Sequence, residues 1–173
     1  MIFRQMFDST SGTYSYLLAS RRGGEALIID PVLEKVDRYL QLLRELELKL
    51  VKAVDTHLHA DHITGLGALR DRTHCITVMG EQSGVDVVSM RVSEGDKVKI
   101  EGVALDVLYT PGHTDDSYSF LLPDRVFTGD TLLIREARGE RTPEWRSSTA
   151  ISVHLRQAAQ ATGRHNGVPG SRL

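Results

Sequence analysis

Six consecutive residues hold four side chains that can bind a metal ion. Residues 57–62 read HLHADH, in a chain that has only seven histidines. Imidazole nitrogen suits zinc, iron, copper and nickel, and an added carboxylate favours open catalytic sites over closed thiolate sites. We therefore expect a metal centre rather than a chance surface cluster. The candidate ligands in this segment are His57, His59, Asp61 and His62.

Two further candidate ligands stand alone in later turns. His113 lies in TPGHTDD, where Pro111 and Gly112 predict a turn after the strand DVLY, and Asp130 lies in FTGD. Taken singly, His113 is typical of a loop histidine, and Asp130 of a turn or helix-cap residue. Three loops that follow strands and carry ligand-type side chains favour one shared site at one edge of a sheet.

The elements that must position these residues form a mixed pattern of helices and strands. Residues 12–30 predict two strands around a turn, and the apolar spacing within residues 34–50 predicts an amphipathic helix. A buried strand over 50–57 would run into the histidine cluster, which would open a helix over 61–72. The remaining predicted strands lie at 75–80, 96–110, 118–123 and 124–130. A layered α/β fold fits this pattern best.

Composition excludes several classes of protein. The chain has 173 residues, 40% hydrophobic and 25% charged, which are ordinary values for a globular domain. A net charge of -2 gives no reason to expect nucleic acid or an anionic membrane surface as a partner. The single cysteine, Cys75, excludes an internal disulfide, and the N-terminal residues lack the pattern of a secretory signal. No apolar run approaches the roughly 20 residues that span a bilayer. We expect a cytoplasmic protein.

Three motifs together resemble a known superfamily. THLHADH, TPGHTDDSYSF and FTGDT are similar to the metallo-β-lactamase superfamily, and this resemblance implies an αββα sandwich with a metal site along one edge. Within the superfamily, IDPV, THLHADHITG and TGDTLLIR resemble the persulfide dioxygenases, also called sulfur dioxygenases or ETHE-type proteins. The resemblance covers about residues 1–135.

The resemblance to persulfide dioxygenases implies a specific site. One Fe(II) would be held by His57, His113 and Asp130, leaving positions open for O2 and a persulfide. The implied reaction oxidises glutathione persulfide with O2 and releases sulfite and glutathione. His59, Asp61 and His62 would then orient the ligands and water.

Two alternatives stay open at this point. Hydroxyacylglutathione hydrolase, or glyoxalase II, shares the HxHxDH motif. The resemblance of this chain to that hydrolase implies two zinc-type ions. One would be bound by His57, His59, His113 and Asp130. The other would be bound by Asp61, His62, Asp130 and a late histidine. A bridging hydroxide would attack a thioester. A third interpretation is a non-catalytic metal-binding protein on a broken scaffold. The sequence does not decide the oligomeric state, and a homodimer is compatible with it.

Residues 136–173 differ in composition from residues 1–135. They contain six Arg and three Glu but no Lys, Asp, Phe or Tyr. Persulfide dioxygenases continue here with a glycine-rich GTGRTDFQNGDPR segment and a late GHDY, which this chain lacks. When residues 136–173 are back-translated and read in shifted frames, the possible codons permit those segments. We therefore interpret residues 136–173 as a frameshifted tail. A disordered basic tail is the alternative. On this interpretation residues 1–135 form a truncated metallo-β-lactamase-like domain, and the C-terminal part of the sandwich is incomplete.

Overall fold

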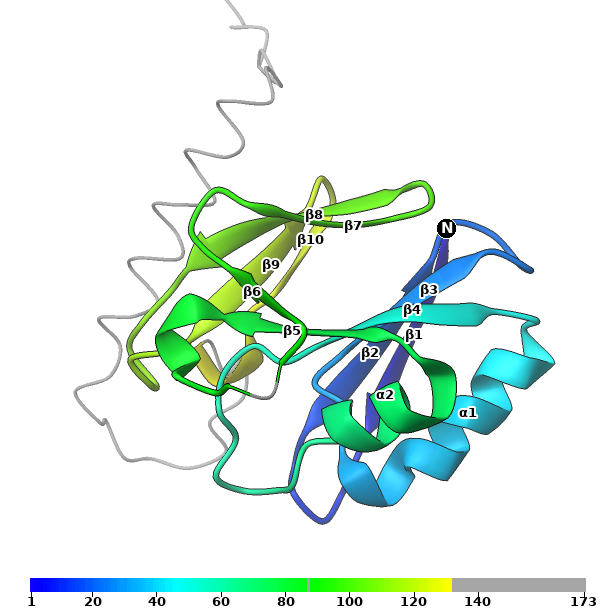
Figure 1. The fold of residues 1–173 in the computed structure, drawn as a ribbon, viewed down its shortest axis with the longest axis horizontal. Helices are drawn as coiled ribbons and strands as arrows, with labels where there is room; N and C mark the ends of the chain where they lie inside the picture. The colour runs from blue at the N-terminus through cyan, green and yellow to red at the C-terminus, as the bar shows by residue number, and fades with distance from the viewer. Residues whose placement is uncertain (87, 132–173) are drawn as a thin grey trace, which may run out of the picture.

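A computed structural model of the chain describes residues 1–86 and 88–131. Residues 136–173, for which a frameshifted or disordered tail is predicted, lie outside the described residues. The described part consists of two β-sheets with two α-helices (Figure 1). Within it, no helix has the length and apolar character needed to cross a membrane.

The larger sheet has six strands in the order β1-β2-β3-β4-β5-β6. Strands β1 to β3 pair antiparallel, and β3 to β6 pair parallel. The predicted hairpin of residues 12–30 is confirmed as β2 and β3. The strands are β1 (Ile2–Phe7), β2 (Tyr14–Ala19), β3 (Glu25–Ile29), β4 (Lys49–Val54), β5 (Ile76–Gly80) and β6 (Met90–Val92).

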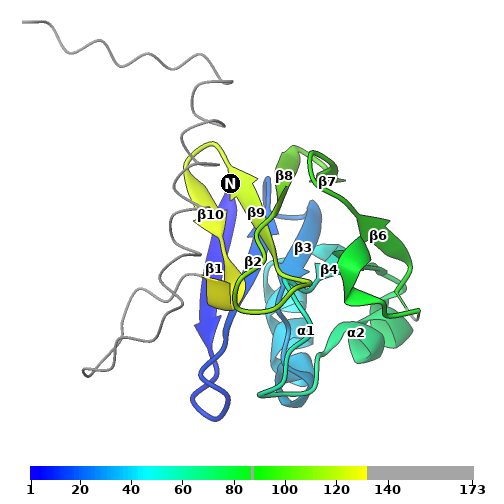
Figure 2. The same ribbon diagram turned by 90° about the vertical axis from the view of Figure 1, so that its left-hand side faces the viewer.

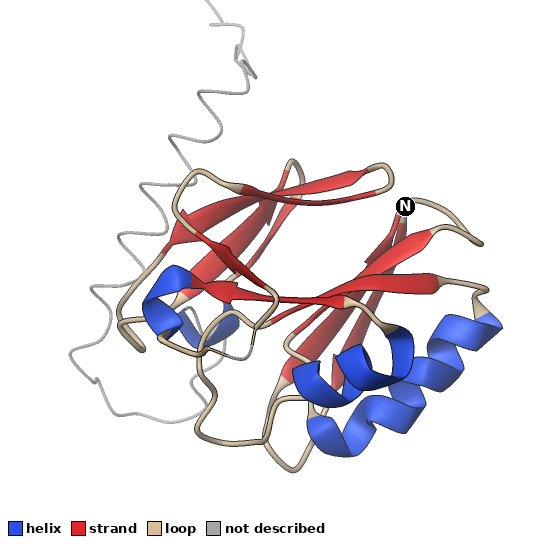
Figure 3. Cartoon of the chain, viewed as in Figure 1, coloured by secondary structure: helices blue, strands red, loops and turns tan. Residues whose placement is uncertain are grey.

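Two helices cover one face of this sheet, as Figures 1 and 3 show. Helix α1 (Val36–Glu45) follows a short 3-10 turn over Leu33–Lys35 and buries Val36, Tyr39, Leu40 and Leu43. Helix α2 (Leu66–Thr73) buries Leu66 and Leu69. The apolar residues of both helices share one core cluster with side chains of β2, β3 and β4.

The smaller sheet packs on the opposite face of the larger one. Its four antiparallel strands have the order β10-β9-β8-β7. A second core cluster fills the space between the sheets and includes Leu27, Val54, Leu105 and Phe120. Strand β10 packs on β1 across the two sheets, where the ring centroids of Phe127 and Phe3 lie 6.2 Å apart (Figure 2). The strands are β7 (Lys97–Ile100), β8 (Val103–Tyr109), β9 (Tyr118–Leu122) and β10 (Arg125–Phe127).

One prediction about the elements is wrong. Residues 61–72 were expected to form a helix opened by the histidine cluster, but α2 begins only at Leu66. Backbone contacts hold the preceding segment as a loop, because Leu33 N–H donates to the carbonyl of Ile63 and Gly65 N–H donates to that of Pro31. Residues 57–65 are therefore a loop fixed against the end of β3, with every candidate ligand of the HLHADH segment on it.

Candidate metal centre

Three loops that follow strand ends bring His57, His113 and Asp130 together. His57 lies after β4, His113 after β8 and Asp130 after β10. Each side chain offers one ligand atom, and these three atoms all lie within 4.8 Å of one another. Oδ2 of Asp130 lies 3.9 Å from Nε2 of His57 and 3.6 Å from Nε2 of His113. Donors bound at about 2.1 Å from one ion can lie up to roughly 4.2 Å apart, so both distances fit a shared metal ion.

The three side chains differ in their exposure. His57 is 2% exposed, whereas His113 and Asp130 are 42% and 43% exposed in the described part of the chain. The group therefore has a buried imidazole on one side and two accessible donors on the other. Two imidazoles with one carboxylate form a donor set that leaves coordination positions for exogenous ligands.

Asp30 and Thr56 fix the ring of His57. Oγ1 of Thr56 lies 3.0 Å from Oδ2 of the buried Asp30 and 2.9 Å from Nδ1 of His57. An ionised carboxylate only accepts, so the single hydroxyl proton of Thr56 goes to Asp30. Thr56 therefore accepts a hydrogen bond from Nδ1–H of His57. This relay leaves the lone pair on Nε2, the nitrogen that lies near Asp130.

Burial keeps His57 suited to bind a metal. Desolvation lowers the pKa of His57, and the neighbouring His59 lowers it further. The neutral imidazole is the form that coordinates a cation.

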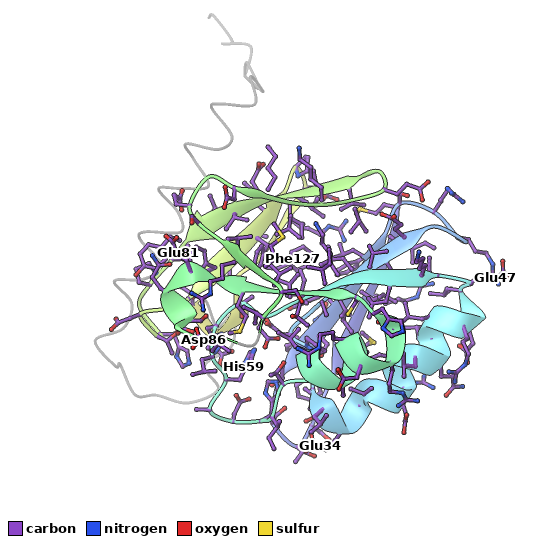
Figure 4. The ribbon with its side chains drawn as sticks, in the orientation of Figure 1. Glu34, Glu47, His59, Glu81, Asp86 and Phe127 are labelled. Carbon is purple, nitrogen blue, oxygen red and sulfur yellow. The ribbon has the colours of Figure 1, made fainter. Side chains whose placement is uncertain are left out.

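His59, Asp61 and His62 form a second group of donors beside the first. Their ligand atoms also lie within 4.8 Å of one another. Nδ1 of His59 lies 3.9 Å from Oδ1 of Asp61, and Nδ1 of His62 lies 3.3 Å from Oδ2 of Asp61. The ring centroids of His57 and His59 lie 4.2 Å apart, so the two groups of donors are in contact. Figure 4 labels His59 on the loop that follows β4.

Asp30 also holds His59. Nε2 of His59 lies 3.2 Å from Oδ1 of Asp30, which itself accepts the backbone N–H of Thr56 at 2.7 Å. Burial opposes a charge on His59, but this hydrogen bond and the negative charges of Asp30, Asp55 and Asp61 outweigh it and raise the pKa to about 9. Burial raises the pKa of Asp55, and the charge of Asp30 raises it further.

Thr13 supports the second group from the loop before β2. Its Oγ1 lies 3.0 Å from Oδ2 of Asp61 and 3.2 Å from Nδ1 of His62. Within the described residues, Nε2 of His62 is buried and has no hydrogen-bond partner. Each of these side chains is thus tethered by one atom while another stays available.

The sequence and structure comparisons agree on a family. The Metallo-beta-lactamase superfamily pattern matches residues 9–156, which is most of the chain. The chain belongs to the metallo-beta-lactamase superfamily. Its two packed sheets with helices on the outer face of the larger sheet, and its metal-type donors at the strand ends, are the α/β fold predicted from the motifs.

Relatives of this metallo-beta-lactamase superfamily chain include two kinds of enzyme. "Persulfide dioxygenase ETHE1, mitochondrial" of Mus musculus is 47% identical over 138 residues, covering 78% of this chain and 54% of the mouse protein. Hydroxyacylglutathione hydrolase of Rhodopseudomonas palustris (strain BisB18) is 35% identical over 132 residues, covering 74% of this chain and 51% of that protein. The chain spans about half the length of these curated relatives.

A solved structure of an ETHE1 protein is also similar to this chain. The crystal structure of ETHE1 from Myxococcus xanthus matches with a TM-score of 0.75 and 54% sequence identity. The match covers 78% of this chain and 59% of that one.

The structure gathers all six sequence-predicted site residues into these two adjacent groups. Sequence reasoning missed the side chains that hold them: Asp30 and Thr56 for the first group and Thr13 for the second. A signal for Asp30 was present, because a carboxylate directly after a buried strand and before Pro31 occupies the same sheet edge as the histidine cluster. Thr13 carried no such signal, since it is 48 residues from Asp61.

Proposed function

We propose that the chain is a mononuclear iron-dependent persulfide dioxygenase that oxidises glutathione persulfide. The observation that carries the proposal is the group of two imidazoles and one carboxylate with an accessible side. Similarity to persulfide dioxygenase ETHE1 at 47% identity supports this choice within the superfamily. The overall reaction consumes one glutathione persulfide, one O2 and one water, and yields glutathione and sulfurous acid, which ionises to sulfite.

His57, His113 and Asp130 would hold the iron. Bound Fe(II) supplies the redox chemistry that joins oxygen to the persulfide sulfur. The buried His57 keeps a neutral Nε2 through its contact with Thr56, and Asp130 contributes the negative charge that offsets part of the cation's charge. The half-exposed His113 marks the side from which substrate would enter.

The second donor group would orient the first without binding iron in this mechanism. Asp30 connects both groups, since its two carboxylate oxygens contact Thr56 and His59. Thr13 connects Asp61 to His62. This hydrogen-bonded frame limits how far the His57 ring and its neighbours can move, which is the role such outer contacts have in metal sites.

Oxygen consumption tests the proposal. The purified 173-residue chain is loaded anaerobically with Fe(II) and mixed with glutathione persulfide in an oxygen electrode. We expect oxygen uptake with formation of sulfite, and none without iron or in D130N. Iron bound without oxygen uptake would favour the non-catalytic metal-binding alternative and contradict the dioxygenase assignment.

A zinc-dependent hydroxyacylglutathione hydrolase is the second candidate. It is favoured by the group of His59, Asp61 and His62, whose spacing suits a second ion, and by the 35% identity to such a hydrolase. The late histidine that this class adds to its second ion has no counterpart within the described residues. Two zinc ions per chain with hydrolysis of a hydroxyacylglutathione thioester would support this candidate.

We further propose that residues 1–135 form the metallo-β-lactamase-like domain and that residues 136–173 are encoded in shifted frames. The composition of residues 136–173, with six Arg and three Glu but no Lys, Asp, Phe or Tyr, supports this division. Resequencing the gene tests it, since an intact frame encoding EARGERTPEW in several isolates contradicts a sequencing error. A cytoplasmic location and a homodimer stay predictions.

A further inference from the structure

Two loops that carry candidate ligands contact each other at the strand ends. One follows β4 and holds His57 and His59, and the other follows β8 and holds His113. Where the second loop enters β9, Tyr118 N–H donates a backbone hydrogen bond of 2.8 Å to the carbonyl of Thr56 in the first loop.

A second contact follows two residues further along the first loop. The N–H of Leu58 donates to Oδ2 of Asp116 at 2.8 Å. A side-chain carboxylate here takes the acceptor role that a backbone carbonyl would have in a regular ladder. Hydrogen bonds with an ionised acceptor are shorter and stronger than neutral ones.

This hydrogen bond lies where it can affect the geometry of the site. Leu58 lies between His57 and His59 in the chain, and Asp116 lies three residues after His113. The bond therefore connects the backbone that carries the buried imidazole with the loop that carries the exposed one. The rings of His57 and His113 meet edge to face, with centroids 5.2 Å apart.

We propose that Asp116 is a positioning residue of the metal centre, which sets the separation of His57 and His113 by holding the N–H of Leu58. This inference rests on the metal centre of the proposed function. Asn keeps a side-chain oxygen on the same length of side chain, whereas Ala removes the acceptor and Glu is longer by one methylene.

The neighbouring Asp115 provides a matched control. It is exposed and carries the same charge, and within residues 1–86 and 88–131 its carboxylate has no hydrogen-bond or ion-pair partner. D115A removes a charge from the loop without removing the contact to Leu58. D116N removes a charge but keeps an oxygen acceptor, and D116A removes both the charge and the acceptor.

Cobalt(II) affinity, measured against a competing chelator with the full chain, separates these effects. Because loss of an outer contact that orients ligands costs about 10–100-fold in metal affinity, we expect that loss for D116A. D115A should bind like the wild type, and D116N should be much closer to the wild type than to D116A. Equal binding by D116A and the wild type overturns the proposal, and so does equal weakening in D115A and D116A, which would indicate a charge effect.

Amide hydrogen exchange at Leu58 provides a readout without metal. In the metal-free protein, exchange at Leu58 should be slow in the wild type and D115A and fast in D116A, while the amides of β3 and β4 stay protected in all three. Fast exchange at Leu58 in the wild type overturns the inference by itself. A different result would contradict the proposed function: the wild type binds no metal, and its exchange at Leu58 is slow but becomes fast in D116A. Asp116 would then hold the loop without positioning a metal ligand.

Discussion

A methyl group on Gly129 would overlap the side-chain oxygen of Thr56 and lie 2.9 Å from its Cβ. Gly129 also has a φ of +50°, in the left-handed region that other residues avoid. The loop after β10 thus approaches the loop after β4 as closely as backbone allows. Because Asp130 is the next residue, this close approach brings its carboxylate to the imidazole of His57.

G129A should therefore damage both stability and the site. We expect the free energy of unfolding to fall by about 1–3 kcal/mol, as for other overpacked positions, and metal binding to be lost because Thr56 must shift. Urea denaturation and metal analysis measure the two effects. The control is G67A in α2, where a new Cβ meets nothing within 4 Å. G67A should be stabilising by about 0.5–1 kcal/mol. A G129A protein with wild-type metal content would contradict the close approach.

H113A should lose the bound metal while keeping its fold. The side chain of His113 is half-exposed and, in the described residues, contacts mainly the other candidate ligands, so its removal leaves no large cavity. Elemental analysis after dialysis measures the loss, and circular dichroism checks the fold. H74N is the matched control, because His74 is an exposed residue at the left-handed end of α2, a conformation that Asn tolerates. Retention of metal by H113A would remove this residue from the site.

T13V should destabilise the second donor group. Valine has nearly the shape of threonine but lacks the hydroxyl that contacts Asp61 and His62. The loss of hydrogen bonding should lower the free energy of unfolding by about 1 kcal/mol, and T13S should restore it. Urea unfolding of the metal-free protein is the measurement. Equal stability of T13V and the wild type would show that the hydroxyl contributes nothing to this group.

The stability of the chain should also fall in acid through Asp8. Hydrogen bonds from Ser11, together with the Lys35 ammonium 3.2 Å away, lower the pKa of Asp8 to about 2. The unfolded carboxyl has a pKa of about 3.9, so below that pH the unfolded chain binds a proton that the folded chain does not. This contribution is present above about pH 4 and lost towards pH 2. Urea denaturation of D8N across this window should show a weaker pH dependence than the wild type. Identical pH profiles would contradict the role of Asp8.

Much of this fold could be predicted from the sequence, because the residue patterns that indicate helices and strands are local. The three-and-four spacing of Val36, Tyr39, Leu40, Leu43 and Leu46 predicted α1. The first four side chains are buried, whereas Leu46 follows the end of the helix and is partly buried. The strands that end at the site were visible as short apolar or alternating runs. Strand β1, a partly exposed edge strand, and strand β6, with three residues, were not predicted, although the equally short β10 was.

The candidate ligands were also predicted, but not the contacts that hold them. Because each follows a strand, His57, His113 and Asp130 were predicted to meet at one edge of a sheet. They do meet, but the single sheet was wrong, since β4 belongs to the six-stranded sheet and β8 and β10 belong to the four-stranded one. The contacts of Asp30 with Thr56 and of Asp116 with Leu58 join residues 26 and 58 positions apart. Such pairs depend on sheet order and loop geometry, which periodicity does not encode. The late start of α2 has the same cause, because backbone contacts to Pro31 and Leu33 keep residues 57–65 out of a helix.

Anaerobic titration of the metal-free chain with Fe(II) tests the central claim most directly. The free iron concentration is followed with a chromophoric chelator, and the same titration is run on D130N. The account predicts one tightly bound iron per wild-type chain and no tight binding in D130N. Unchanged iron binding in D130N, or a wild-type chain that binds no iron, would contradict the shared site of His57, His113 and Asp130.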